Sequence, residues 1–263
     1  MIALFVLKLS AGITLMWWLM PRKDVTDGFF RIQMRLLLGL AVLAALLLSS
    51  AGTWDDLPDA PSAAALSVAT AGQQRLVEIG VAVAAYAGSV FWALGRRLPG
   101  NICIHMLTLA SIVALGLHSC RVPNQASLPL QLLSDFSSAA VLGSVMTGML
   151  LGHWYLTTPT MSIRPLWWFI KAISAAGGVR LVASAWSAAQ FGFPSEDLTR
   201  TIWLATRWIG GIVVPLAVAV IVWRILKYRN TQSATGVLFA GLILVFMAEM
   251  AASLLERDMK IPF

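Results

Sequence analysis

Ionisable side chains inside long apolar runs are the residues of this sequence that could do chemistry. They are Glu78, His105, His118, Asp135, His153, Lys171, Arg180, Arg207 and Glu249. A charged side chain at the centre of a bilayer costs about 3 kcal/mol, so such residues usually face the interior of a helical bundle and mark a working site.

Three of these residues are candidate proton acceptors. Asp135 and His118 lie near the ends of their apolar runs, and Glu249 lies near the end of the last run. A carboxylate in a low-dielectric interior needs a cation or a hydrogen-bond donor to stay ionised, and without one it becomes neutral. Either form suits a group that takes up or releases protons. The alternative is a buried structural ion pair, for example between Glu249 and Arg207.

Two histidines predict a second layer of polar residues. His105 and His153 fall at similar depth on neighbouring antiparallel runs, with Lys171 near the same level. Two histidines on adjacent helices can ligate a b-type haem. Gly148 and Gly152 would allow the close approach of a flat ring, although such spacing also serves plain helix packing. No other metal site is indicated, because the sequence has no CxxCH and no CxxC pair.

The elements that must position these residues are transmembrane helices. The 263 residues are 59% apolar and only 12% charged, whereas a soluble domain averages about 45–50% apolar and 25% charged. Eight apolar spans are expected at about 2–20, 34–52, 77–95, 101–119, 131–157, 166–190, 202–226 and 235–255. Pro215 lies inside the seventh span and should kink it. We therefore expect an all-α, polytopic membrane bundle forming one transmembrane domain over residues 1–263.

The distribution of basic residues predicts the orientation of the bundle. The loops after the odd-numbered spans carry Arg22, Lys23, Arg31, Arg35, Arg96, Arg97, Arg164, Arg224, Lys227 and Arg229, whereas the other loops and the C-terminus carry Arg75, Arg121, Arg200, Arg257 and Lys260. Basic loops stay in the cytoplasm, so both termini should lie outside. The same rule explains the net charge of +7 without nucleic-acid binding. A bacterial inner membrane is the expected location.

The end of the chain resembles a known group of membrane proteins. Ala248-Glu249-Met250, followed by Glu256-Arg257, is similar to the closing acidic-then-arginine pattern of the membrane-anchor subunits of the polysulfide-reductase and dimethyl-sulfoxide-reductase class. The resemblance implies eight helices, outer termini and a quinol-oxidising site on the outer side, from which electrons pass to a soluble redox partner. It also implies that Glu249 and Arg257 lie near a quinone pocket.

These observations predict a membrane subunit of a respiratory electron-transfer complex that contacts lipid, other membrane subunits and a soluble redox subunit. Asp135, His118 and Glu249 would accept protons, and Arg207 would hold a quinone oxygen or pair with a carboxylate. Haem b between His105 and His153 is a further expectation. Two alternatives are a transporter or channel and a structural scaffold subunit. At most the chain is a quinol-reactive part of an enzyme, because it has no Walker A, GxSxG, HExxH or GxGxxG motif.

Overall fold

The computed structural model describes residues 2–51, 71–121, 125–158, 160–193 and 197–262. Within these ranges eight helical spans are long and apolar enough to cross a membrane. This confirms the predicted all-α architecture. The elements are α1 (Ile2–Leu19), η1 (Arg22–Asp24), α2 (Asp27–Ala51), α3 (Ala71–Ala93), α4 (Arg97–Arg121), α5 (Leu128–Thr157), α6 (Arg164–Phe191), α7 (Leu198–Trp208), η2 (Ile209–Val213), α8 (Val214–Lys227) and α9 (Thr231–Met259).

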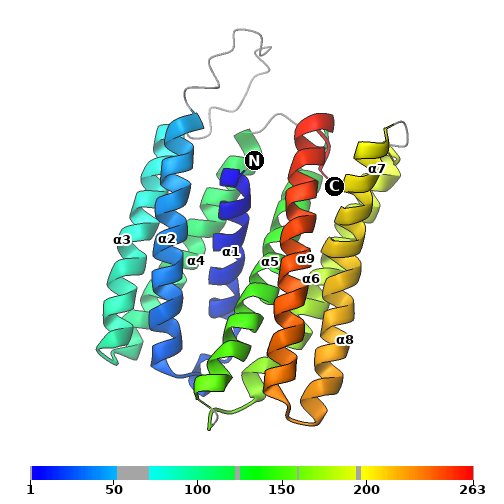
Figure 1. Ribbon diagram of the computed structural model, residues 1–263. Helices are drawn as coiled ribbons and strands as arrows, with labels where there is room; N and C mark the ends of the chain where they lie inside the picture. The colour runs from blue at the N-terminus through cyan, green and yellow to red at the C-terminus, as the bar shows by residue number, and fades with distance from the viewer. Residues whose placement is uncertain (1, 52–70, 122–124, 159, 194–196, 263) are drawn as a thin grey trace.

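The spans run alternately up and down, and the two ends of the described chain lie at the same end of the bundle (Figure 1). We call this the outer end, following the charge distribution, and the opposite end the inner end. Helix α5 is central, since it contacts α1, α4, α6 and α9. Helices α2, α3 and α4 pack on one side, and α6 to α9 on the other.

Several helices are longer than their apolar runs. Helix α2 begins at Asp27, so Arg31 and Arg35 belong to the helix rather than to the preceding loop. Helix α5 has 30 residues, which is about 45 Å at 1.5 Å per residue and exceeds the ~30 Å hydrocarbon core. Its inner end must therefore reach the lipid headgroups or the helix must tilt.

The seventh span is continuous but irregular. A five-residue π-helix, Ile209–Val213, joins α7 to α8 immediately before Pro215. Proline lacks the N–H that an α-helix needs and its ring clashes with the preceding turn. A π-turn relieves this conflict, and such turns occur frequently at functional sites. The irregularity predicted at Pro215 is thus present as a π-turn rather than as a simple bend.

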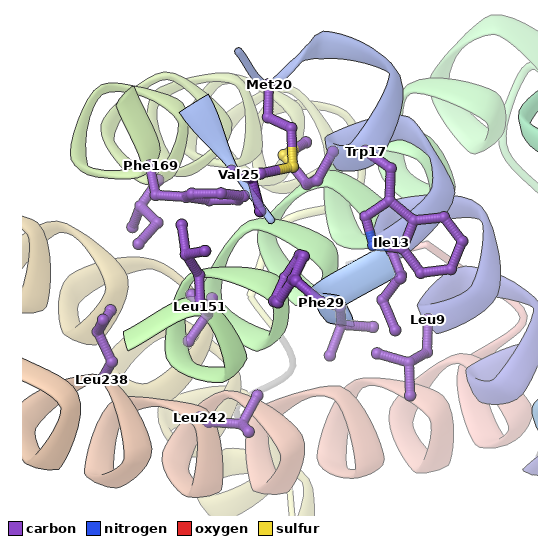
Figure 2. Close-up of a cluster of buried hydrophobic side chains, with 14 of the residues drawn as sticks. Leu9, Ile13, Trp17, Met20, Val25, Phe29, Leu151, Phe169, Leu238 and Leu242 are labelled. Carbon is purple, nitrogen blue, oxygen red and sulfur yellow. The ribbon is translucent and has the colours of Figure 1, made fainter. Parts of the chain in front are cut away.

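The inner half of the bundle has an apolar core. Figure 2 shows Ile13 and Trp17 of α1, Phe29 of α2, Leu151 of α5 and Phe169 of α6 within one cluster. All five are almost completely buried. The buried charged side chains lie instead in the outer halves of their spans: Lys8, Glu78, Asp135, Arg180, Arg207 and Glu249.

A very close contact joins α1 and α5 near the middle of both helices. A Cβ added at Gly12 would lie 1.9 Å from the carbonyl oxygen of Ala139, and one added at Gly143 would lie 2.1 Å from the backbone of Gly12. Only glycine fits at both positions, as at other small-residue interfaces in membranes. This contact sets the spacing between Lys8 of α1 and Asp135 of α5.

Candidate functional site

The first part of the site is a buried ion pair between α1 and α5. Lys8 Nζ lies 2.9 Å from Asp135 Oδ1, and both side chains are at most 4% exposed. Ser119 Oγ of α4 donates a hydrogen bond to Asp135 Oδ2 over 2.6 Å. The carboxylate therefore joins three helices. The sequence places Lys8 in the outer half of its span but does not predict this pairing.

The second part is an ion pair between α7 and α9. The Arg207 guanidinium donates to the carboxylate of Glu249, and both side chains are at most 1% exposed. A second guanidinium nitrogen of Arg207 donates to Ser138 Oγ of α5 over 3.0 Å. This pair was an alternative suggested by the sequence, and the structure confirms it.

Helix α5 connects the two pairs to a third cation. Arg180 of α6 donates from Nη1 to the carbonyl oxygen and hydroxyl of Ser134, over 2.7 and 2.8 Å, and to Ser137 Oγ over 3.1 Å. The serines that accept hydrogen bonds from Arg180 thus flank Asp135 in the sequence. The run of serines among the polar residues of α5 was the available signal for these hydrogen bonds, because positions i, i+3 and i+4 share one helix face.

Glu256 of α9 links the pairs electrostatically and is partly exposed. It interacts with Lys8, Asp135, Glu249 and Arg207. Lys8 is also attracted to Glu249. We use the name outer network for Lys8, Ser119, Ser134, Asp135, Ser137, Ser138, Arg180, Arg207, Glu249 and Glu256.

The outer network extends inward from one end of the bundle. Counting residues from the outer ends of their helices, Glu256 lies about 5 Å deep, Asp135 about 10 Å and Arg180 about 16 Å. Within the described residues the network holds three cations, Lys8, Arg180 and Arg207, and three carboxylates. Such balance is what a low-dielectric interior requires, because an unpaired buried ion is very costly.

Some carboxylate oxygens in the network are available to receive a proton. Glu249 Oε2 and Glu256 Oε1 are buried and accept no hydrogen bond from the described part of the chain. Carboxylates and serine hydroxyls that share hydrogen bonds inside the bundle, with Glu256 nearer the outer end, are groups that can bind and release protons. They can also hold the helices in register.

The remaining outer candidates are His118, Arg257 and Glu78. His118 is half-buried on α4, one residue before Ser119. Arg257 is exposed near the end of α9. Glu78 is buried on α3, which packs against α2 and α4. Its Oε2 atom has no hydrogen-bond partner among the described residues. The structure thus brings Asp135 and Glu249 into one network and leaves Glu78 outside it.

The inner candidates are at the surface. The side chains of His105, His153 and Lys171 are all exposed, and His105 makes an edge-to-face contact with Trp18 at 6.3 Å between ring centroids. Axial ligation of haem requires both imidazoles to face one enclosed iron site. These exposed rings do not fit a haem held between α4 and α5.

The small residues next to His153 serve helix packing. A Cβ added at Gly148 would lie 3.5 Å from the Phe169 ring of α6, and one added at Gly152 would lie 2.6 Å from Thr235 Oγ1 of α9. The spacing thus lets α6 and α9 approach α5, which is the alternative that the sequence left open.

A lipid-facing groove lies beside the Arg207–Glu249 pair, and the sequence did not predict it. Its volume is about 310 Å³, and its lining consists of Ile202, Ala205, Thr206, Ile209, Gly210, Val214, Leu244 and Met247. Four of these side chains, Ile202, Ile209, Leu244 and Met247, are 43–58% exposed, so the groove opens toward lipid. The π-turn η2 forms one wall.

Only a thin layer separates this groove from the ion pair. Gly210 lines the groove, and a Cβ added at the next residue, Gly211, would lie 2.8 Å from Arg207 Nη1. Ala248, which precedes Glu249, packs against both glycines. A molecule in the groove would therefore be within one residue layer of the guanidinium.

Comparison with protein-family models, with curated proteins and with solved structures found no match. The eight apolar spans show an integral membrane protein.

Proposed function

We propose that the chain is the quinol-oxidising membrane subunit of a respiratory electron-transfer complex, and that its outer network receives the protons released there. The proposal places the protein in a bacterial inner membrane with the outer end away from the cytoplasm. It also includes a partner subunit that carries a redox centre, as the resemblance to the anchor subunits implies.

The observation that carries the proposal is the apolar groove backed by a buried ion pair. A quinol is a lipid-soluble ring that reaches its site from the bilayer, so a groove open to lipid and lined by apolar side chains suits it. Thr206 is a polar side chain in the lining. Arg207 and Glu249 lie behind Gly210 and Gly211.

The residues of the chain have distinct tasks in this scheme. A quinol, when oxidised, supplies two electrons and two protons, and the electrons leave to the redox centre of the partner. Glu249 accepts the two protons in turn, because it is the carboxylate nearest the groove, and it releases the first before the second arrives. Arg207 keeps Glu249 ionised and therefore able to accept a proton. Glu256, partly exposed near the end of α9, returns the proton to the outer surface.

A groove-filling substitution tests the proposal. Ala205 lines the groove and is exposed, so Ala205→Phe should occupy it without touching the ion pair. Ala217 of α8 is also exposed but does not line the groove, so Ala217→Phe is the matched control. Chromatography of the lipid extract measures quinone retained per purified chain. We expect Ala205→Phe to weaken retention about tenfold or more, which corresponds to 1.4 kcal/mol.

Two results would contradict the proposal. One is a wild-type protein that retains no quinone when purified from quinone-containing membranes. The other is equal loss in the Ala205→Phe and Ala217→Phe variants, since that would show a general effect of a bulky exposed side chain rather than occupancy of the groove.

The π-turn favours one other function, that of a transporter. Irregular helices line the sites of many secondary transporters, and η2 with Pro215 makes the seventh span irregular beside the outer network. A transporter works without a redox partner. Solute-driven proton movement by the purified chain alone in liposomes, with no quinol present, would favour this function over quinol oxidation.

A further inference from the structure

A basic pocket at the inner end of the bundle is independent of the outer network. Its volume is about 800 Å³, and it is lined by Met20, Pro21, Arg22, Lys23, Asp24, Trp92, Arg97, Asn101 and Arg164. These residues come from the α1–α2 connection, the end of α3, the start of α4 and the start of α6. They lie where the spans reach the membrane surface.

The lining carries four cations and one carboxylate, and the carboxylate is already engaged. Arg164 lies 3.6 Å from Asp24, and Arg97 lies 2.8 Å from Asp27, which is outside the lining. Arg22 and Lys23 form no ion pair with the described residues. Two positive charges are thus left to attract an anion.

Hydrogen-bond donors at the pocket also lack partners. Arg22 Nη1 and Trp92 Nε1 are buried atoms with no hydrogen-bond partner in the described part of the chain. Trp92 is 4% exposed and is held in place by stacking on Phe30 at 4.6 Å between ring centroids. Asn101 Oδ1, an acceptor in the same lining, also lacks a partner in the described part of the chain. Such groups are costly to leave unsatisfied, so the polar groups around the pocket are not fully satisfied by the described protein itself.

The backbone adds to the positive potential. Helix α4 begins at Arg97, and this N-terminus lies at the pocket. The N-terminal end of a helix carries about half a positive charge and favours phosphate groups. Partial burial also lowers the pKa of the Arg22 guanidinium by removing its hydration, which a bound anion would offset.

We propose that this pocket binds the phosphate group of an anionic membrane phospholipid. Arginine forks match phosphate oxygens, and basic pockets between transmembrane helices on the cytoplasmic side bind anionic headgroups. Met20, Pro21 and the Trp92 ring give the headgroup an apolar border. A free phosphate ion shares this chemistry, but the location of the pocket at the membrane surface favours a lipid headgroup. The inference goes beyond the proposed function and does not depend on it.

Thermal stability of the purified full chain in detergent tests the site, with added phosphatidylglycerol, phosphatidylcholine or inorganic phosphate. The test variant is Arg22→Gln/Lys23→Gln, which breaks no ion pair between described residues. The control is Arg96→Gln/Arg224→Gln, which removes two exposed cations that do not line the pocket. We expect phosphatidylglycerol to stabilise the wild type and the control alike. The test variant should need a phosphatidylglycerol concentration about 25-fold higher for the same stabilisation, which is about fivefold for each cation removed.

Each outcome decides between the sources of phosphate. Stabilisation by phosphatidylglycerol but not by phosphatidylcholine, lost in the test variant only, supports the lipid. Stabilisation by inorganic phosphate alone, with the same dependence on Arg22 and Lys23, overturns the lipid source. Equal effects of both lipids, or equal responses of test and control variants, overturn the site. If the double variant does not fold, Lys23→Gln alone, with an expected fivefold change, serves the same comparison.

Discussion

Substitution of Arg207 by methionine should strongly destabilise the bundle. The change leaves Glu249, which is 1% exposed, as a buried carboxylate without its cation, and it removes the hydrogen bond to Ser138. Removing one partner of a buried pair costs about 3–5 kcal/mol. Methionine keeps an unbranched apolar stem and has no charge, so most of the cost comes from the loss of the charge.

The double variant Arg207→Met/Glu249→Met separates pairing from packing. Replacing a whole buried pair with apolar side chains is often neutral or stabilising. We therefore expect the double variant to be within about 1–2 kcal/mol of the wild type, so that the two positions couple by about 3 kcal/mol or more in a double-mutant cycle. Unfolding by SDS in mixed micelles, followed by circular dichroism, gives the free energies. Arg224→Met, at an exposed position, is the control and should change stability by at most about 0.5 kcal/mol.

A small cost for Arg207→Met, below about 1 kcal/mol, would refute the reasoning. So would a double variant that is less stable than either single variant. Both results would mean that other groups stabilise the buried charge of Glu249, so that its pairing with Arg207 would not be needed for stability.

Further changes test the packing, the second ion pair and the orientation. Gly12→Ala should lower the free energy of unfolding by about 3 kcal/mol or more, because the added Cβ has no room against α5. Gly39→Ala, whose Cβ would have nothing within 4 Å, should be neutral or stabilise the protein by up to about 1 kcal/mol. Equal effects of the two changes would contradict the close approach of α1 to α5. Lys8→Met should cost about 3 kcal/mol by isolating Asp135, and Lys8→Arg should recover part of it in the same unfolding assay. A cysteine at Gln125, in a variant without the native cysteines, should react with an impermeant thiol reagent added outside intact cells, and labelling only after permeabilisation would invert the topology.

The helices could be predicted from the sequence because lipid imposes a simple rule. Every span of about 20 apolar residues has to be helical, since no water satisfies the backbone there. The ends were harder to predict. Residues such as Arg31 continue α2 beyond its apolar run, and nothing in hydropathy indicates that a helix continues into the headgroup region.

The polar contacts could be predicted only in part. The positions of Asp135 and Glu249 along their spans predict that both lie in the same half of the membrane. The Arg207–Glu249 pair is one of the alternatives that the sequence suggests. Depth also placed Lys8 in this half, but its pairing with Asp135 could not be predicted, because it depends on the close packing of α1 against α5 at Gly12. Depth alone also grouped His105 with His153, although both side chains are exposed on the surface.

The groove beside η2 was beyond sequence reasoning for a similar reason. Pro215 predicted an irregular span, but the choice of a π-turn and its position against α9 follow from packing. Glycine is common in membrane helices. That Gly210 and Gly211 form a thin wall between the groove and the Arg207–Glu249 pair is visible only in three dimensions.

The measurement that most directly tests proton transfer in the outer network is an infrared difference spectrum recorded when the purified protein, with its redox partner, oxidises a quinol. If Glu249 accepts a proton, the wild type should show a new band from a protonated carboxylic acid, and Glu249→Gln should lack it. A spectrum without any carboxylic acid band, or a band that persists unchanged in Glu249→Gln, would contradict the assignment of the network as the proton acceptor.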